Sequence, residues 1–167
     1  IPEFMQIGQD IDGEAAGDYS GRSVSLSSDG SIMAIGAPNN DGNGGNSGNV
    51  RVFEDVSGTW TQIGQDIDGL AAGDGSGFSV SLSSDGSIVA VGAVDENNNN
   101  TGYVRVFENI SGTWTQIGPT LNGDNIGDYF GRSISLNSDG TILVIGAHRD
   151  DQNNPNNDGP GQVKIYE

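Results

Sequence analysis

The sequence predicts an all-β fold made of repeated antiparallel sheets, on three observations. A unit with a central Ser-Asp-Gly turn occurs three times, at residues 23–37, 79–93 and 133–147. Its apolar residues form short runs that either alternate with Ser or are continuous, a pattern typical of strands. The 167 residues include 28 glycines, which is too many for helices, and their regular spacing argues against a disordered chain.

Four strands are expected in each repeat. In the first repeat they are residues 23–26, 32–36, 50–53 and 60–63. The first alternates Ser with Val or Leu, and the Asp29-Gly30 turn after it is a strong hairpin signal because both positions tolerate a left-handed backbone. The second is continuously apolar, as expected of a strand that is covered on both faces.

The repeat length favours β-propeller blades over a solenoid or a sandwich. Gly36, Gly92 and Gly146 are equivalent and lie roughly 55 residues apart, within the range of propeller blades. Ser and Gly on the first strand fit close to an axis, while large side chains fall on the outer strands, where blades splay apart. These large residues are Phe53, Trp60, Phe107 and Trp114.

Three blades per chain are expected, in one domain over residues 5–167 with repeats at about 5–56, 57–110 and 111–167. Residues 1–4 resemble a cloning-vector remnant. Since residues 4–8 match a fourth strand and the chain ends in a third, the N-terminal strand would complete a C-terminal blade.

Three blades cannot close a ring, because propellers have roughly 4 to 8. The sequence therefore predicts a homodimer that forms a six-bladed ring by exchange of the N-terminal strand. The alternatives are a fragment of a longer propeller and, less favoured, a trimer of nine blades. The expected assembly residues are Phe4, Gln6, Ile7, Val163, Ile165 and Tyr166.

The net charge of −17, from 23 acidic and 6 basic residues, argues against nucleic acid and anionic membrane surfaces as partners. The chain has no cysteine, so neither disulfides nor thiolate metal sites stabilise it. No apolar run is long enough to span a bilayer, and no signal peptide is recognised.

Recurring carboxylates are the first candidate binding residues. Two Asp-Ile-Asp-Gly motifs suggest calcium ligands but supply too few oxygens, so turn formation is preferred; they contribute Asp10, Asp12, Asp66 and Asp68. An Asp after Gly recurs in every repeat, and fixing the loop by accepting backbone N–H bonds is preferred over metal ligation there; these are Asp18, Asp74 and Asp128. No cofactor is expected, with calcium as the alternative.

Arg22 and Arg132 occupy equivalent positions before the first strand of a repeat, with Phe78 between them in the series. They could bind an anion at the mouth of a ring channel, but pairing with neighbouring Asp residues is favoured. The single histidine, His148, is expected to be solvated, and no nucleophile or metal cluster is recognised. Three Asn- and Asp-rich loops could bind calcium or a sugar, or be merely hydrated: residues 39–46, 95–100 and 150–158.

Several motifs together resemble the FG-GAP repeat family. They are Gly-Asp-Tyr-Phe-Gly-Arg-Ser-Ile-Ser-Leu at 127–136, Val-Ile-Gly-Ala at 144–147, Ile-Gly-Ala-Pro at 35–38, and the Gly-x-Val-x-Val-Phe segments at 48–53 and 102–107. The resemblance implies propeller blades like those of integrin α-subunits and an extracellular or cell-surface location. The Phe-Gly pair survives only as Phe130-Gly131, and the Asp-x-Asp-x-Asp-Gly calcium loop of integrin-type blades is absent, so metal binding does not carry over.

The expected function is a non-catalytic scaffold or interaction module that assembles by ring closure. The first alternative is a lectin-like or calcium-dependent binder of a glycan or protein ligand, which would use the face that carries the long loops. An enzyme with a site at the channel mouth is the second alternative. It would need a cluster of acid, base and nucleophile that does not repeat, whereas the repeats are nearly identical.

Overall fold

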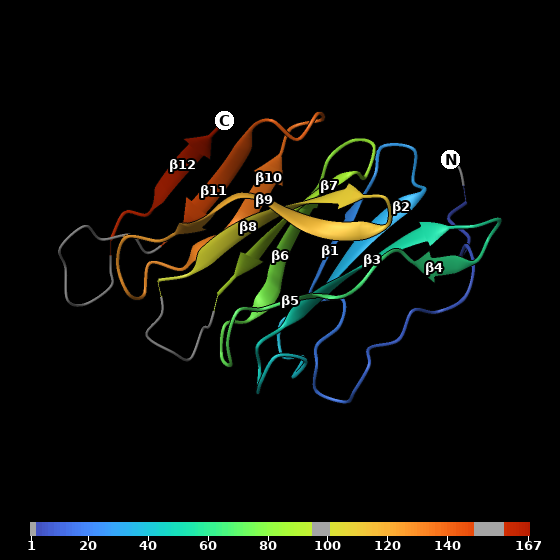
Figure 1. Ribbon diagram of the computed structural model, residues 1–167, viewed down its shortest axis with the longest axis horizontal. Coiled ribbons are helices and arrows are strands. Elements are labelled where there is room, and N and C mark those ends of the chain that lie inside the picture. Colours follow the sequence, from blue (N-terminus) through green and yellow to red (C-terminus); the bar gives the residue numbers. More distant parts are fainter. Residues whose placement is uncertain (1–2, 95–100, 149–158) are drawn as a thin grey trace.

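The computed structural model describes residues 3–94, 101–148 and 159–167, and these residues form only strands, turns and loops. Three antiparallel sheets lie one after another along the molecule (Figure 1). Sheet A comprises β1 (Ser23–Leu26), β2 (Ile32–Ala37), β3 (Asn49–Asp55), β4 (Trp60–Gln62) and β5 (Ile67–Asp68). Sheet B comprises β6 (Ser76–Leu82), β7 (Ile88–Ala93), β8 (Tyr103–Ile110) and β9 (Thr113–Asn122), and sheet C comprises β10 (Phe130–Leu136), β11 (Leu143–Ala147) and β12 (Gln162–Tyr166).

Each sheet is a meander in which consecutive strands pair, as expected for propeller blades. In sheet A the outer strand is split, because β4 and β5 both pair with β3 where sheet B has the single strand β9. Residues 63–66 separate β4 from β5, although Gly64 has nearly the same φ as its equivalent Gly118 within β9, +70° against +69°. Sheet C has three strands in the part of the chain that the structure describes, and no described strand pairs with the outer edge of β12.

The Ser-Asp-Gly hairpins form as predicted, with one difference in their backbone. Gly30 takes a left-handed conformation with φ +77°, but Asp29 does not. The carboxylate of Asp29 instead accepts hydrogen bonds from the hydroxyls of Ser27 and Ser31 and from the Ser31 N–H. Asp therefore suits this position because its side chain accepts these hydrogen bonds, not because it tolerates a positive φ.

The hydrophobic core lies between the sheets. Between sheets A and B, Val50 and Val52 of β3 pack in one cluster with Val80 and Leu82 of β6. Between sheets B and C, a second cluster joins residues of β7 and β8 to residues of β10 and β11, with Phe130 as its largest member. Neighbouring sheets thus stack face to face, and only the outward faces of sheets A and C lack a covering sheet.

The first strands of the three sheets lie side by side, so small residues on them have a steric reason. Ser23 donates from its hydroxyl to the carbonyl of Gly77, and Ser79 donates in the same way to Gly131. A Cβ added to Gly36 would lie 2.0 Å from the Gly77 carbonyl oxygen. Inner strands of adjacent sheets thus approach too closely for larger side chains, as the sequence predicted.

The predicted N-terminal strand does not form. Residues 3–13 contain no strand. They run along sheet A near β4, while β12 lies at the other end of the molecule (Figure 1). The strand prediction is therefore wrong for the isolated chain.

Candidate functional site: the loop rim and the N-terminal segment

The carboxylates that recur after Gly fix the loops before β1, β6 and β10. Asp18 accepts a hydrogen bond from the Ala15 N–H at 3.1 Å, and Asp74 accepts one from the Ala71 N–H at 2.7 Å. Each bridges three residues of loop and closes a turn. The preferred sequence interpretation, a loop-fixing role, matches these contacts.

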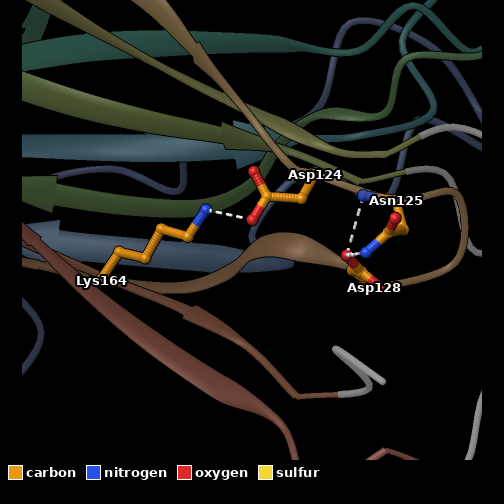
Figure 2. Close-up of polar contacts among 4 residues, drawn as sticks. All are labelled: Asp124, Asn125, Asp128 and Lys164. Carbon is orange, nitrogen blue, oxygen red and sulfur yellow. Dashed lines mark hydrogen bonds and ion pairs between the residues drawn. The ribbon is translucent and has the colours of Figure 1, made fainter. Parts of the chain in front are cut away.

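The third carboxylate of this series, Asp128, is buried and has the same role. It accepts hydrogen bonds from the backbone N–H of Asn125 at 2.9 Å and from its side-chain amide at 3.2 Å (Figure 2). Beside it, the Lys164 ammonium lies 2.6 Å from a carboxylate oxygen of Asp124. This ion pair ties β12 to the loop before β10.

The side chains around the recurring carboxylate differ from sheet to sheet. Beside sheet B, the Tyr103 hydroxyl donates to Asp74 at 2.8 Å and accepts from the Leu70 N–H. Burial raises the pKa of Tyr103 to about 12. Because these neighbours do not repeat, the rim that the loops form presents three different surfaces.

Among the residues that the structure describes, several acidic side chains gather on the rim beside sheet A. The Asn49 amide donates to carboxylate oxygens of Glu14 and Asp66, at 3.2 and 3.4 Å, and the Asn40 amide also donates to Glu14. Burial raises the pKa of nearby Asp68, and the negative charges of Asp66 and Glu14 raise it further. Repeat comparison did not reveal this network, because the positions of Glu14 and Asn49 hold Leu70 and Tyr103 in the second repeat.

The weak calcium candidates gain no support. Asp10 and Asp66 each accept a hydrogen bond from the Gln four residues earlier, and Asp12 offers its backbone carbonyl to Arg51. Asp68 in turn offers its carbonyl to Arg105. Within the described ranges, no group of three or more acidic or histidine side chains is placed to hold a metal ion.

The expected pairing of Arg22 with an Asp is wrong. Its guanidinium carbon lies 4.1 Å from the centre of the Phe78 ring, and no described carboxylate contacts it. Arg132 approaches the same ring, at 5.1 Å, and also stacks near Tyr129. The sequence showed that these positions are equivalent, but not that two arginines converge on one phenyl ring.

His148 is exposed and stacks on Tyr129, with the ring centres 5.2 Å apart. Its neighbours in the sequence, residues 149–158, lie outside the described residues, as does the loop at 95–100. Of the three polar loops expected as ligand sites, only residues 39–46 are described. That loop is tied to the chain by hydrogen bonds from the Asn43 side chain to the carbonyls of Gly69 and Leu70.

The N-terminal segment binds sheet A through contacts that recur one repeat later. The Trp60 indole N–H donates to the Ile7 carbonyl at 3.1 Å, and the Trp114 indole N–H donates to the Ile63 carbonyl at 2.9 Å. The Gln9 side chain donates to the carbonyl of Trp60.

Other contacts of the segment repeat as well. Gln65 donates to Trp114 as Gln9 does to Trp60. Gly8 and Gly64 both have positive φ, at 75° and 70°. Residues 6–12 therefore contact sheet A in the way that residues 62–68 contact sheet B. Residues 62–68 include β5 and the end of β4, both of which pair with β3, whereas residues 6–12 belong to no sheet. The sequence signal for these contacts was the recurrence of residues 6–13 as 62–69 and of residues 57–64 as 111–118.

A family model described as FG-GAP repeat matches residues 11–53 and 120–163, together just over half of the chain. The chain belongs to the FG-GAP repeat family. The two matches cover most of sheets A and C with the loops that precede them. No curated protein matches the chain.

Two solved structures match this FG-GAP protein, and the first of them resembles it in fold. One is a Bacteroides uniformis protein named as a candidate 6-phosphogluconolactonase, with a TM-score of 0.54 and 18% identity over 86% of this chain and 35% of that one. The other is hydrazine synthase from Kuenenia stuttgartiensis, with a TM-score of 0.47 and 14% identity over 74% of this chain and 30% of that one. The chain spans about a third of the length of either. The described residues include no helix that could cross a membrane.

Proposed function

We propose that the chain is a non-catalytic β-propeller scaffold and that two copies assemble into a closed six-bladed ring. A contrast between equivalent residues carries this proposal. Val80 and Leu82 on β6 are 9% and 7% exposed because sheet A covers them, whereas their counterparts Val24 and Leu26 on β1 are 63% and 56% exposed. Sheet A thus has an uncovered apolar face of the kind that packs between sheets elsewhere in the molecule.

Sheet C has the complementary uncovered face. Val163 and Ile165 of β12 are 66% and 71% exposed, while their counterparts Val50 and Val52 of β3 are fully buried against sheet B. Both internal interfaces join a β3-type face to a β6-type face. Sheet C of one copy and sheet A of another can therefore pack in the same way, and two such seams fall in the class of obligate interfaces, above roughly 2,000 Å² in total.

The N-terminal segment supplies the strand that sheet C lacks. In sheet A, Phe53 lies opposite Gln62, and in sheet B, Phe107 lies opposite Gln116. The counterparts of these pairs are Tyr166 on β12 and Gln6 of the second copy. In this register the segment would cover the open edge of β12, which would otherwise invite aggregation.

The number of sheets favours a second copy over other occupants. Closed propellers have roughly 4 to 8 blades, so two copies of three blades fall within the range and three copies do not. Further blades of a longer polypeptide would satisfy the same faces and are the other outcome of the tests below.

In this proposal the ring is an extracellular or cell-surface scaffold, and its loop rim receives a protein or glycan ligand. The rim varies between repeats while the strands repeat, which is the usual arrangement of a binding surface on a rigid frame. A single exposed histidine and nearly identical repeats give no basis for catalysis.

Disulfide crosslinking tests the ring closure. The Ile63 N–H donates to the Val52 carbonyl, so the adjacent Phe53–Gln62 pair is a narrow one, with Cα atoms about 4.5 Å apart as a disulfide requires. We expect the double variant Gln6→Cys, Tyr166→Cys to form a covalent dimer on oxidation. The chain has no other cysteine.

The matched control is Met5→Cys with Tyr166→Cys, since neighbouring residues of a strand point to opposite faces. A covalent dimer from the first pair and little from the second supports the register. Equal crosslinking of both pairs, or none of either, contradicts it.

A further inference from the structure

Hydrogen bonds join the inner strands and turns of neighbouring sheets, and each kind runs in one direction along the molecule. Three kinds of bond recur, each once between sheets A and B and once between sheets B and C. Because the donor of each kind always lies on the same side of the interface, the two end sheets keep opposite halves of it. Sheets A and C therefore carry complementary polar groups beside their uncovered apolar faces.

The first kind of bond joins a serine hydroxyl to a glycine carbonyl of the next sheet. Ser23 and Ser79 are its donors, at 2.8 and 2.6 Å. The next donor in the series is the Ser133 hydroxyl on β10, and the next acceptor is the carbonyl of Gly21, just before β1. Sheet C thus keeps the donor of this bond, and the segment that leads into sheet A keeps the acceptor.

The second kind of bond joins a backbone N–H to a serine hydroxyl of the preceding sheet. The Leu82 N–H donates to the Ser25 hydroxyl at 2.9 Å, and the Leu136 N–H donates to the equivalent hydroxyl of sheet B at the same distance. Since β1 and β6 pair with their second strands in the same register, the Leu26 N–H faces away from β2 as the Leu82 N–H faces away from β7. Here sheet A keeps the donor, Leu26, and sheet C keeps the acceptor, the Ser135 hydroxyl.

The third kind of bond joins the Ser-Asp-Gly turns. The Ser28 N–H donates to the Ser84 carbonyl, and the Ser84 N–H donates to the Ser138 carbonyl, both at 2.8 Å. The turn after β10 thus keeps a donor, the Ser138 N–H, and the turn after β1 keeps an acceptor, the Ser28 carbonyl. The serines that carry the open halves at sheet C are exposed, while their counterparts in sheet B are buried or half-buried; they are Ser133, Ser135 and Ser138.

We propose that these three bonds select a second copy of the chain and fix how it docks, with sheet C of one copy against sheet A of the other. This rests on the proposed ring. On closure every open donor meets an open acceptor, and the inner strands and turns form a continuous belt of hydrogen bonds around the axis. Packing sheet C on sheet C, or sheet A on sheet A, would instead bury donors and acceptors without their partners, which costs free energy for each group.

Hydrogen exchange at single amides tests the belt, followed by NMR on the wild-type dimer. The reference amides are those of Leu136 and Ser84, which make the same kinds of bond inside the chain. We expect the amides of Leu26 and Ser138 to exchange within about tenfold of these reference rates, since each would have a partner at the seam.

Serine variants separate the hydrogen bond from burial at the seam. Ser135→Ala removes the proposed acceptor of the Leu26 N–H, so exchange at Leu26 should rise by about tenfold while Ser138 stays protected. The matched control is Ser81→Ala, which removes the acceptor of the Leu136 N–H within the chain. It should raise exchange at Leu136 and leave Leu26 unchanged.

Three results would overturn the proposal. One is a dimer in which the amides of Leu26 and Ser138 exchange as fast as those of exposed turns. Another is protection of Leu26 that Ser135→Ala does not change. In either case the dimer itself stands. A chain that stays monomeric at every concentration overturns both the belt and the ring.

Discussion

Single carboxylates stabilise the Ser-Asp-Gly hairpins, and hydrogen bonds within each turn lower their pKa values. The backbone N–H of Ser31 and the hydroxyls of Ser27 and Ser31 lower the pKa of Asp29 to about 2. Equivalent hydrogen bonds lower the pKa of Asp85 and Asp139. The Ser-Asp-Gly pattern predicted these turns from sequence, because a short polar side chain that bonds its own turn is a local property.

This gives a pH dependence with a defined sign. Because the folded pKa of Asp29 is below its ordinary value of 3.8, its contribution to stability is present above about pH 4 and is lost as the pH falls towards 2. We expect Asp29→Asn to lower the melting temperature at neutral pH and to lose this difference near pH 2, as followed by circular dichroism. A difference that does not change with pH would refute the assignment.

The contacts of Arg22 show where residue-scale prediction failed. Its sequence neighbours include several carboxylates, so ion pairing was a reasonable expectation, but the aromatic ring that it meets belongs to another repeat. Partners set by how sheets stack cannot be inferred from sequence distance.

At the scale of strands, the predictions were accurate where repeats constrain them. β1 was predicted to the residue, and β2 and β3 differ only in length. The split of the outer strand into β4 and β5 was missed, because the same Trp-Thr-Gln-Ile-Gly sequence occurs in the continuous strand β9. The N-terminal strand was predicted only because residues 4–8 are similar to the fourth strand of a repeat. A strand also requires the edge of another strand to pair with.

Glycines of the second strands offer a test at this scale. A Cβ on Gly92 would lie 2.2 Å from the Gly131 carbonyl oxygen of the next sheet, whereas the nearest atoms to a Cβ on Gly146 all belong to Ser133 of its own sheet. If a second copy lies there, the carbonyl of its Gly21 takes the place of Gly131. We therefore expect Gly146→Ala to weaken dimerisation strongly and to leave the monomer folded.

Gly92→Ala is the matched control. It should destabilise the fold itself, by about 3 kcal/mol in urea unfolding, since backbone must move to admit the methyl group. A Gly146→Ala protein that dimerises as well as the wild type would argue against the proposed seam.

For the whole molecule, the sequence predicted the all-β class and the repeat order, and the family match supports both. The sequence could not predict which faces of the sheets have no neighbouring sheet to cover them. Val24 and Val80 are the same residue in the same motif, but one is exposed and the other is buried. Only the presence or absence of a neighbouring sheet separates them, and no local pattern encodes that.

The ring closure is therefore tested most directly by the mass of the folded protein in solution. Size-exclusion chromatography coupled to light scattering should give about 34 kDa, twice the 17.2 kDa of one chain, over a wide range of concentration. A folded species of one chain mass at every concentration would contradict the account.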